Sequence, residues 1–333
     1  YLAYIYEYGF SAIWLFIGMA LGLILMRRYA SRIKKKADEM KVYSMPEYFF
    51  RILGKKNGLL FSLLLVLQFF GLLIINFIIS GKILSSIFGI PYFLAVIIGG
   101  IIILTYLLLA GFKAVIKTDF FQLIIMFIMS LTVGLFLLGK TSVSSTDISL
   151  GSLGIGNTIG FLIIAGFGIM VAPDLWQRIF ATKDEANLRR GLNYSAIILP
   201  ILAITISILG LATKHAFPNI NPEDALVTGF STLLPFGLKE FGMVLLYAVA
   251  LSSSDTVTFV VSSIFTRDLK NYSKKYSKES MKKLTRMFMI IFVTLAIVVA
   301  IFYQNILHLG FSLASLNLML FPVVFGSLHW NLK

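Results

Sequence analysis

Long apolar runs, each about the length needed to cross a lipid bilayer, dominate this sequence. A bilayer core about 30 Å thick requires roughly 20 apolar residues in a helix. Runs of this kind occupy residues 9–26, 58–79, 91–110, 120–138, 159–179, 192–213, 236–265, 287–302 and 309–328. Because lipid offers no hydrogen bonds to an exposed backbone, each run must be helical. The sequence therefore predicts an all-α, polytopic membrane protein of one domain, with about nine transmembrane helices.

The basic residues predict the topology. Lys and Arg outnumber Asp and Glu by 29 to 15, but they gather in short segments between the apolar runs, which argues against a nucleic-acid partner. Loops rich in Lys and Arg stay on the cytoplasmic side. Alternation of the runs places all the basic segments on one side, at residues 27–56, 113–117, 183–190 and 267–283. We therefore expect a multi-pass protein of the plasma membrane, with its first residue outside and its last residue inside.

The amino end predicts further sequence. The chain begins at Tyr1 rather than Met, and no charged segment of a signal peptide precedes the first apolar run. A chain that starts outside usually requires either a cleaved peptide or an earlier transmembrane helix. We therefore expect a helix upstream of Tyr1.

The fifth apolar run contains residues that disturb a helix. Gly166, Gly168 and Pro173 all lie within it, and such residues cause kinks or breaks. Discontinuous helices of this kind line the substrate sites of inverted-repeat transporters. The run predicts a broken helix that faces a ligand site.

Asp255 lies inside the seventh run, where a charge costs roughly 2.5 to 3.5 kcal/mol. Helical spacing places Val249, Ser252, Ser253 and Thr256 on one stripe beside it. Hydroxyl and carbonyl oxygens gathered in this way suit a hard cation such as sodium. In the alternative interpretation, the serines bond back to carbonyls one turn earlier and Asp255 is hydrogen-bonded inside the bundle. Spacing alone leaves both interpretations open.

Asp119 follows Thr118 at the expected start of the fourth run. An acidic residue in the first turn of a helix is favoured by the helix dipole, with Thr as the cap. We favour the cap over a binding role for Asp119.

Three further polar features have simple structural explanations. Asp174 and Arg178 stand four residues apart near the inner end of the broken helix and are expected to pair. Gln68 in the second run and Asn317 in the last could contact a solute. Hydrogen bonding between helices is the simpler interpretation of these two amides.

Patterns typical of enzymes are missing from the sequence. His215, His308 and His329 lie near run boundaries, no H-E-x-x-H helix occurs, and no glycine-rich phosphate loop follows a strand. Asp119 and Asp255 lack the G-x-G-D context of aspartyl intramembrane proteases. We expect no enzymatic activity.

Three segments carry distinctive patterns: "GFKAVIKTDFFQ" at 111–122, "PDLWQRIFATKDEANLRRG" at 173–191 and "ALSSSDTVTFVVSSIFTRDL" at 250–269. Together they resemble the sodium/solute symporter family, which includes the proline, pantothenate and glucose symporters. The first segment is similar to the family's G-G-x-x-A-V-x-x-T-D-x-x-Q pattern and the second to its helix-end pattern. The third is similar to A-x-M-S-S-A-D-S…S-S-x-x-T-x-D and is the most specific of the three. "YSMPEYF" at 43–49 adds a weaker match. The order and spacing of these segments extend the resemblance over nearly the whole chain.

The resemblance implies a LeuT-type fold of two inverted five-helix repeats. Residues 1–139 would be the remainder of the first repeat, without its first core helix, and residues 156–333 the second repeat. In the family, one sodium site uses a carbonyl and two hydroxyls that match Val249, Ser252 and Ser253. A second site in some members matches Asp119, Ser252, Asp255 and Thr256, with Asp255 in place of a hydroxyl.

The resemblance also implies sodium-coupled symport of a small organic solute by alternating access, with sodium as the coupling ion. Gln68, Gly166, Gly168 and Asn317 are the candidate solute residues. The family's sugar-holding and proline-holding positions match Ala165, Gly168 and Ile169, which makes glucose and proline poorer candidates. Proton coupling through Asp119 and Asp255 and a symporter-like sensory domain are the alternative functions.

Overall fold

The computed structural model describes residues 1–110, 112–139, 148–272 and 277–330, and all secondary structure in these ranges is helical. The elements are α1 (Leu2–Tyr8), η1 (Gly9–Ile13), α2 (Trp14–Met40), α3 (Met45–Phe88), α4 (Tyr92–Ala110), α5 (Phe112–Leu138), α6 (Gly154–Val171), α7 (Pro173–Ala181), α8 (Glu185–Ala216), η2 (Pro222–Asp224), α9 (Ala225–Leu233), α10 (Leu238–Tyr272), α11 (Lys278–Phe302) and α12 (Ile306–His329). Nine helical segments in the described ranges are long and apolar enough to cross a membrane. The predicted number of spans is confirmed.

Several helices, among them α2 and α3, are longer than the apolar runs that predict them. The first candidate span continues to Met40 and the second begins at Met45 and ends at Phe88. Apolar runs mark only the part of a helix that lies in lipid, while Lys, Arg and Glu are good helix formers and extend it into water. The same effect corrects the prediction for Asp119. Because α5 begins at Phe112, Asp119 lies inside the helix and not in its first turn, and the cap interpretation is wrong.

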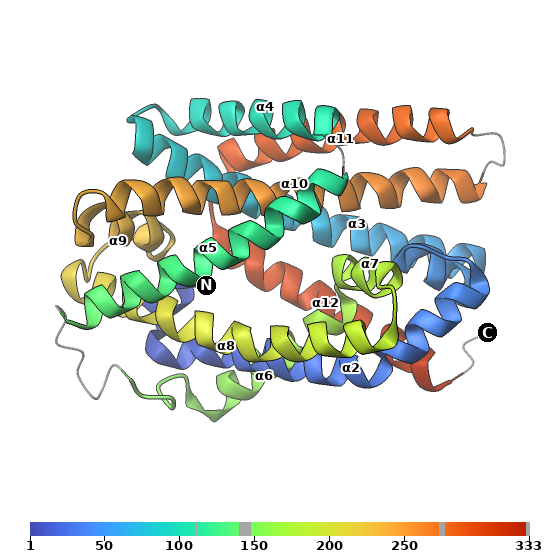
Figure 1. The fold of residues 1–333 in the computed structure, drawn as a ribbon, viewed down its shortest axis with the longest axis horizontal. Coiled ribbons are helices and arrows are strands. Elements are labelled where there is room, and N and C mark those ends of the chain that lie inside the picture. The colour runs from blue at the N-terminus through green and yellow to red at the C-terminus, as the bar shows by residue number, and fades with distance from the viewer. Residues whose placement is uncertain (111, 140–147, 273–276, 331–333) are drawn as a thin grey trace.

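Two groups of helices make up the molecule. In one, α3 packs against α10, α4 and α11; in the other, α2 packs against α6 and α8. Figure 1 shows α5 and α12 crossing obliquely between these groups. Each crossing helix contacts both groups, since α12 packs on α3 and α6, and α5 packs on α10 and α8. The crossing helices therefore hold the two groups together.

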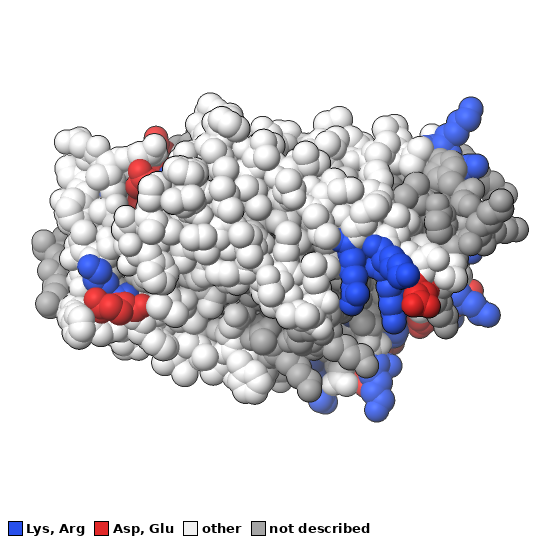
Figure 2. Space-filling view, turned by 90° about the horizontal axis from the view of Figure 1, so that it is seen from above, with Lys and Arg blue, Asp and Glu red and all other residues white. Residues whose placement is uncertain are grey.

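Charged side chains gather at the ends of the helices. Figure 2 shows a broad middle zone without charged side chains, and Lys and Arg concentrated toward the end where α2 stops and α3 starts. This end is called the basic end below. The uncharged middle zone has the pattern expected of a surface that faces lipid.

The predicted discontinuity of the fifth run is present, but it does not lie at the two glycines. α6 ends at Val171, Ala172 is extended (φ −75°, ψ 105°), and α7 begins at Pro173. Gly166 and Gly168 are helical. The break falls at the proline because proline cannot donate the hydrogen bond that would continue the helix.

A short segment at residues 45–53 holds α7 in place. Gly54 (φ 77°, ψ 178°) separates this segment from the rest of α3. The rings of Tyr48 and Trp176 lie 5.2 Å apart, and those of Phe49 and Trp176 5.5 Å apart. Trp176 is fully buried. These three rings are called the aromatic cluster below, and they join α7 to the start of α3.

Candidate functional site

The amide side chains of Gln68 and Asn317 lie at one level of the bundle. Gly71 of α3 meets Leu313 of α12 so closely that a Cβ on Gly71 would lie 2.5 Å from Leu313 Cδ2. The two helices run in opposite directions (Figure 1). Gln68 precedes Gly71 by one turn and Asn317 follows Leu313 by one turn. Both amides therefore lie on the same side of this contact, near the middle of their helices.

Neither amide oxygen has a protein partner in the described part of the chain. Gln68 is 3% exposed, and both Gln68 Oε1 and Asn317 Oδ1 are buried without a hydrogen bond. Leaving a buried acceptor unsatisfied costs about 1 to 3 kcal/mol. Such a group in a native protein calls for an explanation such as a bound water, ion or ligand. The sequence suggests that these amides bond to neighbouring helices. In the described part of the chain, such bonding does not account for the two amide oxygens.

Gly168 of α6 lies beside the amide of Asn317. A Cβ on Gly168 would lie 3.2 Å from Asn317 Nδ2, so the amide of Asn317 stands against the bare backbone of this glycine. The rings of Phe167 and Phe321 stack with centroids 3.6 Å apart and fix α6 against α12. Gly168 thus lies beside Asn317, and Gln68 lies at the same level on α3. These three residues, which belong to three helices, are named the amide site.

Gly166 has a different position from the amide site. It faces α2, where a Cβ on Gly22 would lie 2.4 Å from the carbonyl oxygen of Gly166. The same holds one turn away, since a Cβ on Gly18 would lie 2.8 Å from the carbonyl oxygen of Leu162. These glycines let two backbones approach closely. Packing between α2 and α6 accounts for Gly166.

The helix break lies one turn beyond the amide site. The last four carbonyls of a helix have no partner within that helix. At the end of α6, the indole nitrogen of Trp176 donates to the carbonyl of Met170 at 2.8 Å. The amide of Ala172 bonds to the carbonyl of Ile169 at 3.4 Å. The break thus supplies backbone oxygens close to Gly168, partly satisfied by local donors.

The predicted stripe on α10 includes accessible side chains. Val249 and Ser252 are partly exposed and Ser253 is exposed. On the same face of the helix, Gly242 is buried and Val260 is fully buried. The accessible hydroxyls are thus flanked along this face by buried residues.

Asp255 points in another direction, toward α4. Its side chain is 2% exposed, and the hydroxyl of Tyr106 donates a hydrogen bond to Asp255 Oδ2. The same hydroxyl lies 3.3 Å from the carbonyl of Leu251, and Thr256 Oγ1 donates to Asp255 Oδ1 at 3.2 Å. Asp255 and Thr256 are thus in contact. The side chain of Asp119 lies outside the described residues.

Other hydroxyls of α10 bond back to the helix. Ser254 donates to the carbonyl of Ala250 at 2.7 Å, and Thr258 to that of Ser254 at 2.7 Å. Both side chains are fully buried. This back-bonding occurs at residues outside the predicted stripe of Val249, Ser252, Ser253 and Thr256.

Sequence reasoning missed two residues that support this region. Tyr106 bonds Asp255, and Gln122 Nε2 of α5 donates to the carbonyl of Ala248 at 3.4 Å, one residue before Val249. Tyr106 is a hydroxyl inside an apolar run, and Gln122 ends the segment 111–122. A search for polar atoms inside apolar runs would have found both.

The pairing predicted for Asp174 and Arg178 is confirmed. Their charged groups lie 3.8 Å apart, on the exposed side of α7. The exposure of this pair makes it a weak contribution to stability.

Comparison of the chain with known proteins identifies its relatives. The sodium/pantothenate symporter of Haemophilus influenzae is 25% identical over 286 residues, which are 79% of this chain and 58% of that protein. The sodium/proline symporter of Staphylococcus aureus is 26% identical over 285 residues, which are 79% of this chain and 56% of that protein. The chain spans a little over half the length of these relatives.

Solved structures show the same architecture. A Na+-coupled sialic acid symporter in a substrate-bound outward-open state matches with a TM-score of 0.78 at 19% identity, over 99% of this chain and 74% of that one. A manganese transporter of Eremococcus coleocola matches with a TM-score of 0.50 at 17% identity, over 98% of this chain and 76% of that one. These likenesses confirm the predicted LeuT-type fold.

The family assignment rests on the whole length of the sequence. The profile of the Sodium:solute symporter family matches residues 2–149 and 154–332. The two curated relatives are symporters that use sodium. The chain therefore belongs to the sodium:solute symporter family.

Proposed function

We propose that this chain carries the central part of a transport pathway for sodium-coupled symport of a small organic solute. The observation that supports this most directly is the amide site, where two buried amide oxygens lack protein partners. Such acceptors bind N–H or O–H donors of a solute. Family membership supplies the class of reaction.

The solute site is formed by Gln68, Gly168 and Asn317. The described side chains of this site are uncharged, so the site suits hydroxyl and amide donors on a neutral part of the solute. Gly168 leaves room beside Asn317. The named substrates of the relatives, pantothenate and proline, are the first compounds to test in this chain.

The sodium site is formed on α10 by the carbonyl of Val249 and the hydroxyls of Ser252 and Ser253. The exposure of these residues supports this assignment, because oxygen ligands must be reachable to replace a hydration shell. Asp119, Asp255 and Thr256 would form a second sodium site. The contact between Asp255 and Thr256 supports that proposal.

The packing also supports two related halves. α2 packs on α8, α3 on α10, and α4 on α11, while α5 and α12 each cross between the groups. Residues 1–139 and 156–333 would then be the two repeats, with α2 to α5 matched to α8 and α10 to α12. Relative movement of the groups about the crossing helices would give alternating access.

The sodium site is tested by thermal unfolding of the purified protein in sodium chloride and in choline chloride at equal ionic strength. A ligand that binds the folded state raises its stability with concentration. We expect sodium to raise the unfolding temperature of the wild type. Ser252→Ala with Ser253→Ala should raise the sodium concentration needed by about tenfold, equal to about 1.4 kcal/mol.

Ser254→Ala is the matched control, because Ser254 is adjacent in sequence but bonds back to Ala250 on the buried face. It should leave the sodium dependence unchanged. The site is wrong if the double variant and Ser254→Ala respond to sodium alike.

A further inference from the structure

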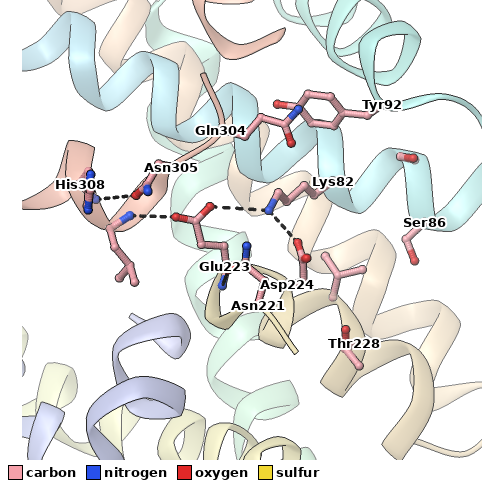
Figure 3. Close-up of a pocket in the computed structure, with 13 residues that line it drawn as sticks. Lys82, Ser86, Tyr92, Asn221, Glu223, Asp224, Thr228, Gln304, Asn305 and His308 are labelled. Atoms are coloured by element: carbon pink, nitrogen blue, oxygen red, sulfur yellow. Dashed lines mark hydrogen bonds and ion pairs between the residues drawn. The ribbon is translucent and has the colours of Figure 1, made fainter. Parts of the chain in front are cut away.

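A pocket of about 780 Å³ lies at the end of the bundle opposite the basic end (Figure 3). The end of α3, the start of α4, the segment η2–α9 and the start of α12 surround it. Figure 3 shows Lys82 between the carboxylates of Glu223 and Asp224 on its wall. The connection and helices at residues 217–233 are called the outer hairpin.

Lys82 ties the outer hairpin to α3 through two carboxylates. Its Nζ lies 2.6 Å from Asp224 Oδ1 and 3.8 Å from Glu223 Oε2. The side chains of Lys82 and Glu223 are only 14% and 7% exposed, while that of Asp224 is 50% exposed. Removal of one partner of a buried ion pair leaves an uncompensated charge, which is strongly unfavourable. The contact is thus sensitive to the loss of either charge.

Glu223 also ties the outer hairpin to α12. Its Oε1 accepts a hydrogen bond from the backbone N–H of Leu307 at 3.2 Å, in the first turn of α12. A carboxylate is favoured at the positive end of a helix dipole. One side chain thereby engages α3 and α12 together.

On its other side the outer hairpin is fastened by uncharged contacts. The hydroxyl of Tyr6 in α1 donates to the carbonyl of Phe217 at 2.5 Å and accepts from the N–H of Ile220 at 3.2 Å. α1 packs on α8. The outer hairpin therefore bridges the two helix groups, with charges on the side of α3 and neutral bonds on the side of α1.

We propose that Lys82, Glu223 and Asp224 form an ionic clasp that holds the outer hairpin shut across this end and releases it during the transport cycle. The proposal rests on the function proposed above. The two helix groups must move relative to each other for access to alternate. Contacts that bridge them must therefore break and reform. Charges on the wall of an open pocket lined by polar side chains can be hydrated when separated, which suits a contact that opens repeatedly.

The chain contains no Cys, so a single introduced thiol reports on the clasp. Thr228 lines the pocket and is partly exposed. In detergent, the rate at which a charged methanethiosulfonate reagent modifies Thr228→Cys measures how often the outer hairpin opens. Adding Lys82→Met should raise this rate about tenfold, and adding Lys82→Arg should leave it near that of Thr228→Cys alone.

Charge exchange separates the clasp from a general loss of structure. Lys82→Glu combined with Asp224→Lys restores one opposite-charge contact and should bring the rate back toward that of Thr228→Cys alone. Asp224→Asn, at the half-exposed position, provides a milder variant that keeps the clasp testable if Lys82→Met does not fold. The clasp is refuted if neither Lys82→Met nor Asp224→Asn changes the rate of modification.

These measurements do not depend on transport. A clasp-dependent rate of modification in a protein without sodium-driven uptake supports the clasp and overturns the proposed function. Sodium-driven uptake, together with a rate of thiol modification that does not change in the Lys82 and Asp224 variants, supports the function and overturns the clasp.

Discussion

The polar side chains in the middle of the bundle differ in whether their oxygens have hydrogen-bond partners. Gln68 and Asn317 keep unsatisfied oxygens, whereas Asp255 is bonded by Tyr106 and Thr256. Burial alone does not separate these cases, since Gln68 and Asp255 are 3% and 2% exposed. The difference is the availability of a donor from a neighbouring helix. An amide oxygen without such a donor can still accept a hydrogen bond, whereas a carboxylate with one already has a partner.

Gly168→Ala tests the amide site. The new methyl group would lie 3.2 Å from Asn317 Nδ2, so the amide must shift by a few tenths of an ångström. We expect the apparent affinity for the transported compound to fall about tenfold, or about 1.4 kcal/mol. Uptake of labelled pantothenate and proline into proteoliposomes provides the measurement.

Gly160→Ala is the control on the same helix, because a Cβ there meets nothing within 4 Å. Equal affinities in the two variants would show that the space beside Asn317 is not used by the solute.

At the scale of the helices, the sequence predicts well which helices exist and in what order they follow. It predicts poorly where each helix begins and ends. All nine spans follow from hydrophobicity, because lipid leaves only helices as an option. The ends of α2 and α3 could not be predicted, since charged helix formers carry the helix past the membrane. The break at Ala172 follows from Pro173. The common level of Gln68 and Asn317 depends on which helices are neighbours, and periodicity within one run does not carry that information.

The crossing of α2 and α6 depends on glycines that the sequence alone does not single out. Gly22→Ala would place a methyl group 2.4 Å from the carbonyl oxygen of Gly166, so the helices must move apart. We expect a loss of about 1 to 3 kcal/mol of stability, seen as a lower unfolding temperature in detergent.

Gly191→Ala in α8 provides the contrast, because a Cβ at that position meets nothing within 4 Å. Alanine is the better helix former by about 1 kcal/mol. This variant should be neutral or more stable. A stable Gly22→Ala protein would mean that α2 and α6 can separate without cost.

At the scale of the whole molecule, two helix groups share a small number of connections. α5 and α12 cross between them, and the outer hairpin bridges them at one end. Proteins with this arrangement can move one group as a body. Under the proposed function, binding of the coupling ion would shift the balance between the two arrangements.

Uptake of labelled pantothenate and proline under defined gradients distinguishes the coupling ions. With equal pH on both sides, an inward sodium gradient should drive accumulation, and replacement of sodium by choline should abolish it. A tenfold gradient supplies about 1.4 kcal/mol for each ion. Accumulation driven by a proton gradient without sodium would instead favour coupling through Asp255. Binding without accumulation under either gradient would favour a sensory role.

The aromatic cluster links α7 to the segment 45–53. The three rings of Tyr48, Phe49 and Trp176 all contact one another, so a tilt of α7 would carry the segment 45–53 with it. Ala172 and Gly54 are the extended or left-handed residues at which these two pieces meet their longer helices. We therefore expect the two pieces to move as one unit about these residues, so that stiffening the backbone at either residue should slow the same motion.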